Sequence, residues 1–260
     1  MDNVLSIAFC IWNITKGRRR MHFVHTCFLP FCVYTTQQIF LQGRLRHMSL
    51  LEIEGLTHSF GDNLLYKNAG FSLNKGEHIG IVGQNGAGKS TLIKICTETI
   101  IPDAGRIIWQ PKITIGYLDQ YAEIDHMMTM KSFLQSAFSH LYEIEAKMTR
   151  LYENAANGDM DCLGVAAQLQ EELERCDFYS IDTHIEQVAN GLGLLAIGLN
   201  RPIEQMSGGQ RAKTILAKLL LEKPDVLLLD EPTNFLDKEH VEWLSDYLFN
   251  LENAFMVVSH

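Results

Sequence analysis

The sequence predicts an α/β fold built around a parallel β-sheet. Three observations support this fold class. Residues 78–83 form a short run rich in β-branched side chains, and a glycine-rich loop and a helix-like segment follow it. Residues 226–230 form a second apolar run that ends at two carboxylates, as expected of a strand buried on both faces of a parallel sheet. The apolar residues of 121–205 recur with helical spacing, which predicts an inserted helical region.

Composition is consistent with an ordinary globular protein. The 260 residues carry 22 Lys+Arg and 31 Asp+Glu, for a formal net charge of -9, and 47% of them are hydrophobic. These values exclude a disordered chain, a collagen-like chain and a polytopic membrane protein. The acidic total also disfavours a protein that coats nucleic acid.

The segment 1–47 differs from the rest of the chain. It carries six basic residues and one acidic residue, and its apolar start precedes the arginine run, which is the wrong order for a secretory signal. The next apolar stretch contains His, Pro and Gln, so a membrane span or a surface anchor is the less favoured alternative. We expect an upstream extension outside the fold, with the domain beginning at Met48. The six cysteines form no C-x-x-C pair, which favours reduced thiols in a cytoplasmic protein.

The loop after the first predicted strand has the pattern of a phosphate-binding loop. Residues 83–91 read GQNGAGKST, which matches G-x-x-x-x-G-K-S/T between a strand and a helix. Glycines allow successive backbone N–H groups to face phosphate oxygens, and the N-terminus of the helix adds a positive dipole end. We expect Lys89 to reach the β- and γ-phosphates and the Ser90 hydroxyl to bind Mg²⁺.

An aromatic residue upstream of this loop is a candidate for stacking on a base. Phe60 lies in the turn HSFGDN between two strand-like runs. The alternative is an ordinary hydrophobic turn residue.

Two carboxylates end the second predicted strand. Asp230 and Glu231 follow VLLL at the carboxyl end of the sheet, where parallel sheets bind ligands. Asp230 is expected to bind Mg²⁺ directly or through water, and Glu231 is suited to act as a general base toward water.

A second anion-binding turn is predicted between these motifs. In MSGGQRAKTILAKLLLEK, Ser207 is a good N-cap, and a helix with one apolar face follows it. An SGGQ turn at a helix N-terminus offers backbone N–H groups to an anion.

Together these motifs resemble those of the ATP-binding cassette (ABC) ATPases over residues 48–260. The resemblance implies a P-loop NTPase fold of the ABC nucleotide-binding type, with an antiparallel β subdomain and an inserted helical subdomain. It implies ATP as substrate and Mg²⁺ as cofactor. The implied catalytic residues are Glu231, Gln120 and His260, and the implied Mg²⁺ residues are Ser90, Gln120 and Asp230. The implied nucleotide-binding residues are Phe60, Gly83, Asn85, Gly86, Ala87, Gly88, Lys89, Ser90 and Thr91, with Ser207, Gly208, Gly209 and Gln210 of the signature.

In this family the signature of one cassette binds the nucleotide of another. The implied partner is therefore a second ABC cassette, in the same chain or in a homodimer. DEPTNFLD resembles the DEPTNHLD of the ABC-F branch, with Phe235 in place of histidine. ABC-F proteins act in translation, ribosome rescue or antibiotic resistance, so the ribosome and transfer RNA are further expected partners, without membrane insertion. A transporter ATPase subunit and a catalytically silent fragment are the alternatives.

The resemblance also suggests how the chain is organised. We expect an upstream extension at 1–47, the first part of the ATP-binding core at 48–120, a helical subdomain at 121–205 and the signature, second acidic strand and switch strand at 206–260. The stripes in the helical segment and the break at 154–161 predict a two-helix hairpin, which is either an ordinary subdomain or an arm. Because the family continues past the switch histidine, we expect the sequence to be the first half of a tandem protein, cut inside its first cassette.

Overall fold

The computed structural model describes residues 7–12, 31–32, 49–118 and 127–259. They belong to two units. The first unit draws on 1–118, 223–237 and 245–260, and the second on 119–222 and 238–244. Helix α7 (Lys238–Phe249) therefore contributes residues to both units.

The first unit contains a three-stranded antiparallel sheet in the order β4-β3-β6. Its strands are β3 (Ser49–Phe60), β4 (Asn63–Asn74) and β6 (Ala104–Trp109). The turn Gly61-Asp62 joins β3 to β4, so that Phe60 pairs directly with Asn63. This sheet confirms the antiparallel subdomain that the resemblance implies.

The same unit contains a six-stranded sheet in the order β2-β1-β5-β9-β8-β7. Four neighbouring strands are parallel: β5 (His78–Gly83), β9 (Ala254–Ser259), β8 (Val226–Asp230) and β7 (Ile115–Tyr117). The predicted parallel sheet is confirmed, and both strands that predicted it lie beside β9. The glycine-rich loop and the two carboxylates consequently follow two strands that are separated by one strand, β9.

Two short strands come from the segment that the sequence places outside the fold. Strand β1 (Ile7–Trp12) runs antiparallel to β5, and β2 (Phe31–Cys32) runs parallel to β1. Without β1, strand β5 would be at the edge of the sheet with a row of unpaired N–H and C=O groups, which the added strand pairs. The remainder of 1–47 lies outside the described residues, and the domain boundary at Met48 stays a prediction.

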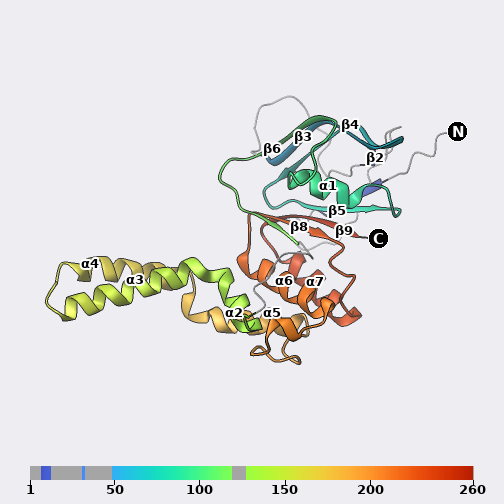
Figure 1. Ribbon diagram of the computed structural model, residues 1–260. Helices are drawn as coiled ribbons and strands as arrows, with labels where there is room; N and C mark the ends of the chain where they lie inside the picture. Colours follow the sequence, from blue (N-terminus) through green and yellow to red (C-terminus); the bar gives the residue numbers. More distant parts are fainter. Residues whose placement is uncertain (1–6, 13–30, 33–48, 119–126, 260) are drawn as a thin grey trace. The chain divides into compact units, whose positions relative to one another are not determined.

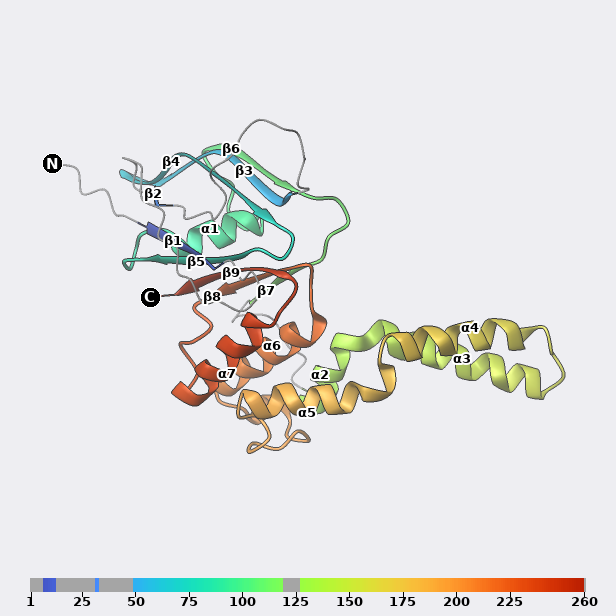
Figure 2. The same ribbon diagram turned by 180° about the vertical axis from the view of Figure 1, so that it is seen from behind.

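Helix α1 (Lys89–Cys96) lies between the two sheets of the first unit, as Figures 1 and 2 both show. Its apolar residues Leu92, Ile93 and Ile95 are at most 2% exposed and join one core with buried residues of β3, β4, β5, β8 and β9. Burial of such side chains is the main stabilising contribution to a fold. Both ends of the glycine-rich loop are therefore fixed by the core.

The second unit is helical, which confirms the helical region expected between the core segments. Its helices are α2 (Met130–Gln135), α3 (Ser139–Ala156), α4 (Cys162–Arg175), α5 (Ile181–Gly191) and α6 (Gly208–Glu222). Helices α3 and α4 lie side by side as an elongated hairpin, which we call the arm (Figures 1 and 2). Leu141 and Leu173 are buried along it.

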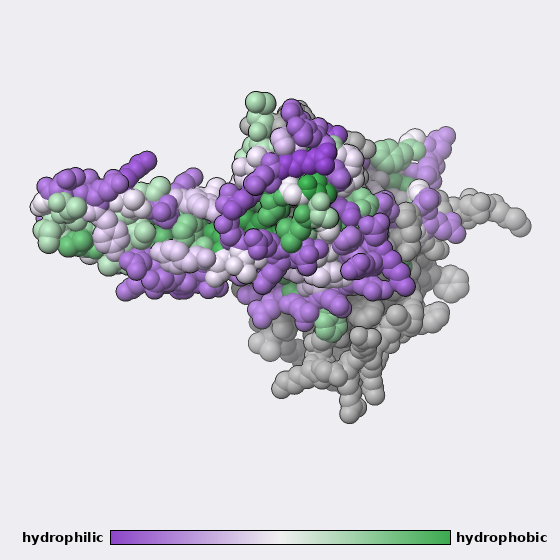
Figure 3. Space-filling model, turned by 90° about the horizontal axis from the view of Figure 1, so that it is seen from below, coloured by the Kyte–Doolittle hydropathy of each residue, from purple (hydrophilic) through white to green (hydrophobic). Residues whose placement is uncertain are grey.

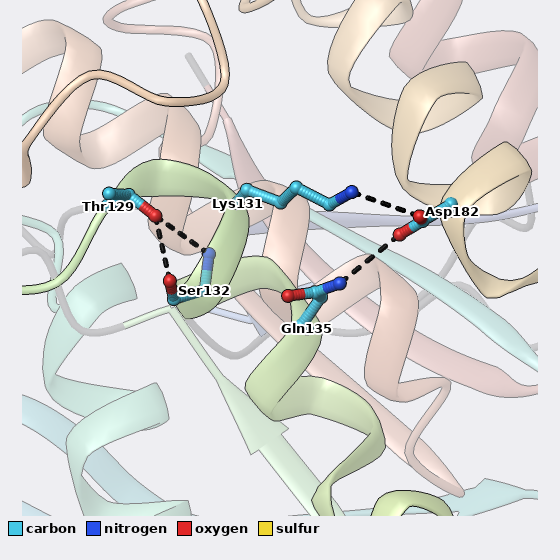
Figure 4. A network of polar contacts seen from close by, with 5 residues as sticks. All are labelled: Thr129, Lys131, Ser132, Gln135 and Asp182. Atoms are coloured by element: carbon cyan, nitrogen blue, oxygen red, sulfur yellow. Dashed lines mark hydrogen bonds and ion pairs between the residues drawn. The ribbon is translucent and has the colours of Figure 1, made fainter.

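Polar contacts connect α2 with α5 near the base of the arm (Figure 4). The Lys131 ammonium lies 3.0 Å from the Asp182 carboxylate, and the Gln135 amide donates to the same carboxylate at 3.2 Å. Thr129 caps α2 by accepting the Ser132 N–H at 3.2 Å. Exposed ion pairs contribute little free energy, so we expect a small contribution to stability from this network. Within the described ranges, no helix is long and apolar enough to cross a membrane.

Candidate functional site

The glycine-rich loop lies between β5 and α1, as the sequence predicts. Gly88 is the N-cap of α1, and its φ of 95° favours glycine. The Lys89 side chain is only 5% exposed and folds back across the loop. Its Nζ donates to the carbonyl oxygens of Gly83 at 2.8 Å and Gln84 at 3.1 Å. An ammonium group is therefore positioned inside the loop.

A pocket of about 520 Å³ opens beside this loop. Its volume lies in the range of small-molecule sites, about 300–1,000 Å³. Eight residues that the sequence predicts for the site line it: Phe60, Asn85, Gly86, Gly88, Lys89, Ser90, Thr91 and Glu231. The structure thus brings the aromatic residue, the loop and the candidate base to one cavity. Gly83 and Ala87 lie in the same strand–loop segment, and Ala87 is buried.

Three residues outside the predicted set of site residues also line the pocket. They are Asn63, Leu65 and Asn234. Asn63 and Leu65 belong to β4, just after the turn that follows Phe60, so pairing of the two predicted strands was the available signal. Asn234 lies in the segment after Glu231, and its N–H donates to the Glu231 carbonyl oxygen at 3.2 Å.

Two oxygen ligands suited to Mg²⁺ meet at the start of α1. The Ser90 hydroxyl donates to Asp230 Oδ1 at 3.0 Å, although 140 positions separate the two residues. Burial raises the pKa of Asp230 above its ordinary value, and the hydrogen bond from Ser90 opposes that rise. Hydroxyl and carboxylate oxygens are the ligands that Mg²⁺ prefers. The pair therefore fits the ion that the resemblance implies.

Glu231 has an uncommon backbone conformation. It follows β8 directly with a φ of 51°, and its N–H donates to the Val258 carbonyl oxygen of β9 at 3.0 Å. Non-glycine residues adopt positive φ rarely, and such strain concentrates at functional sites. The hydrogen bond to β9 fixes the point at which the chain turns, and the Glu231 side chain lines the pocket.

The SGGQ turn forms a reciprocal cap at the start of α6. The Ser207 hydroxyl accepts the Gln210 N–H at 3.3 Å, and the Gln210 side chain accepts the Ser207 N–H at 3.0 Å. This is a capping box, so the predicted N-cap is confirmed. Ser207, Gly208 and Gly209 are exposed in the helical unit. The turn is thus held by two hydrogen bonds and exposed.

Two predicted catalytic residues lie outside the described residues. They are Gln120 and His260. Their roles stay predictions.

Comparison with known proteins identifies the fold and the family of this chain. The solved ATP-binding subunit of an ABC transporter aligns over 82% of this chain and 80% of its own, with a TM-score of 0.55 and 20% identity, which shows the fold. The profile of the ABC transporter family matches residues 66–234. The chain belongs to this family, whose members are ATPases, and membership implies ATP binding and ATP hydrolysis in general.

Its curated relatives include ABC-F proteins. The ABC transporter ATP-binding protein YfmM of Bacillus subtilis is 45% identical over 82% of this chain and 42% of its own length. The tylosin resistance ATP-binding protein TlrC of Streptomyces fradiae is 34% identical over 82% of this chain and 40% of its own length. The energy-dependent translational throttle protein EttA of Escherichia coli K12 is 36% identical over 75% of this chain and 36% of its own length. The chain therefore spans about two fifths of the length of these relatives.

Because Phe60 lines the pocket, removing its aromatic ring should lower the affinity for ATP. We expect Phe60→Ala to weaken ATP binding about tenfold or more, because a base stacked on an aromatic ring gains roughly 1–3 kcal/mol. Leu64→Ala is the matched control, since Leu64 is similarly exposed (51% against 53%) and does not line the pocket. Isothermal titration calorimetry measures both. Equal affinities for the two variants would contradict stacking by Phe60.

Proposed function

We propose that the chain is an ATP-hydrolysing ABC-F-type cassette of a cytoplasmic protein that acts on ribosomes. The observation that supports ATP hydrolysis best is the single pocket shared by Phe60, the phosphate loop and Glu231. A phosphate loop with its lysine and a carboxylate that orients water are parts of the machinery of phosphoryl transfer, and an aromatic ring can hold the base by stacking.

Each part has a distinct task in this proposal. Phe60 stacks on the adenine, and the loop N–H groups bind the phosphates. The Lys89 ammonium leaves the Gly83 and Gln84 carbonyl oxygens for phosphate oxygens. Glu231 accepts a proton from water that attacks the γ-phosphate. Ser90 and Asp230 would bind Mg²⁺, which neutralises charge that develops on the phosphates.

A second cassette completes the site in this proposal. The exposed, capped turn at Ser207 suits an anion held by another cassette, because backbone N–H groups at a helix N-terminus favour negative charge. That cassette is supplied by the same protein or by a second copy. Gln120 is proposed to contact Mg²⁺ and the attacking water, and His260 is proposed to contact the γ-phosphate.

The arm is proposed as the surface that reaches the ribosome. The stretch 139–175 carries eight acidic and three basic residues, for a net charge of −5. Figure 3 shows hydrophilic side chains along both margins of the arm and apolar side chains between them. Met160, Leu163 and Val165 are exposed apolar residues of the stretch 139–175. An acidic arm repels RNA phosphates. Contact with a basic ribosomal protein is therefore favoured over contact with RNA.

Ribosome binding should depend on ATP in the complete protein. We expect it to sediment with ribosomes when ATP is present and hydrolysis is blocked by Glu231→Gln, and to remain in the supernatant with ADP. Lys89→Ala is the matched negative control because it removes the ammonium of the loop. Co-purification with a membrane permease, and no sedimentation with ribosomes, would favour a transporter subunit instead.

A further inference from the structure

A buried tyrosine contacts the phosphate loop from the core side. Tyr66 of β4 is fully buried, and its hydroxyl donates to the Gly88 carbonyl oxygen at the N-terminus of α1. A β-carbon at Gly88 would lie 2.8 Å from the Tyr66 hydroxyl oxygen and 3.3 Å from Leu65 Cδ1. The tyrosine therefore packs directly against the backbone of the loop.

The Gly88 carbonyl oxygen accepts two hydrogen bonds on the core side. One comes from Tyr66, and the other comes from the Leu92 N–H of α1 at 2.9 Å. A carbonyl oxygen has two lone pairs, so both are used. The direction of this carbonyl group is consequently fixed by a strand and a helix together.

The same peptide unit carries an N–H group that belongs to Lys89. A peptide bond is planar and trans, so its C=O and N–H point in opposite directions. The Lys89 N–H is one of the first N–H groups of α1, which have no acceptor within the helix. Because the Gly88 carbonyl points toward Leu92 and Tyr66, this N–H points the opposite way, out of the N-terminus of α1. Lys89 lines the pocket at that end of the helix.

We propose that Tyr66 is a positioning residue, whose hydroxyl presets the Lys89 N–H toward the phosphates of the bound nucleotide. This inference rests on the proposed nucleotide binding. The contrasting explanation is that the hydroxyl only stabilises the core. Burial raises the pKa of Tyr66 well above its ordinary value, so the phenol stays protonated and donates throughout the neutral pH range.

The test compares two Tyr→Phe variants of the full chain. Tyr66→Phe removes the hydroxyl and leaves the ring. Tyr247→Phe is the matched control: it removes a hydroxyl whose pKa is also raised by burial, at a residue that does not line the pocket. Calorimetry gives the affinities for Mg-ATP and Mg-ADP. We expect Tyr66→Phe to weaken both about tenfold, because phosphate-loop N–H groups contact the α- and β-phosphates that ATP and ADP share. We expect Tyr247→Phe to bind both within about twofold of the original chain.

An osmolyte separates two reasons for weaker nucleotide binding by Tyr66→Phe: a smaller folded fraction, and a misplaced Lys89 N–H in the folded protein. Trimethylamine N-oxide favours the folded state, and circular dichroism reports the folded fraction of Tyr66→Phe as it is added. If affinity stays about tenfold low once the variant is fully folded, positioning is supported. If affinity equals that of the original chain, with or without the osmolyte, the inference is overturned. If the original chain binds neither nucleotide, the proposed function fails instead.

Discussion

Glu231→Gln should lower the ATP turnover of the complete protein by about 10²–10⁴-fold, the usual contribution of a general base. The substitution keeps the size of the side chain and removes its basicity. Glu231 lines the pocket from the end of β8, on a different strand from the phosphate loop. ATP affinity should therefore change only a few-fold. A coupled assay for ADP release measures turnover, and calorimetry measures binding.

The matched control for this prediction is Glu252→Gln. Glu252 is exposed in the same unit and does not line the pocket, so turnover should be unchanged. Turnover of Glu231→Gln within a few-fold of the original protein would show that another group accepts the proton.

A large effect on stability is expected at Gly105. Its φ is +102°, and an added β-carbon would lie 2.7 Å from the backbone of Gly55 and Leu56 on the neighbouring strand β3. The β3–β6 register shifts between Glu54 and Thr57, so two backbones approach closely at this irregularity. Gly105→Ala combines overpacking with an unfavourable φ, which together cost about 3 kcal/mol or more. The melting temperature should fall by roughly 6–12 °C.

Gly61→Ala separates the two causes. Gly61 also has a positive φ, of +57°, but no atom lies within 4 Å of an added β-carbon. We expect a loss of about 1 kcal/mol from the backbone conformation alone. Thermal unfolding followed by circular dichroism compares the variants. Equal losses at Gly61 and Gly105 would mean that the neighbouring strand yields to the extra carbon.

Local patterns were sufficient for the elements that carry the motifs. The strand at 78–83, the helix from Lys89 and the strand at 226–230 all follow from short runs whose periodicity depends on near neighbours alone. The cap of α6 was predictable for the same reason, because a capping box spans four residues. The sequence could not place the eight residues of β1 and β2, since their pairing depends on a free edge of β5.

What the sequence determined by itself is the chemistry of the site: a phosphate loop, an aromatic ring and two carboxylates, whose identities need only the printed residues. The tertiary structure decided which of them meet. Ser90 reaches Asp230 across 140 positions because β9 lies between β5 and β8, and this strand order is a long-range property. The hydrogen bond from Tyr66 to Gly88 likewise depends on how one sheet packs over α1. Contacts of this kind are set by packing of the whole core, which no local pattern contains.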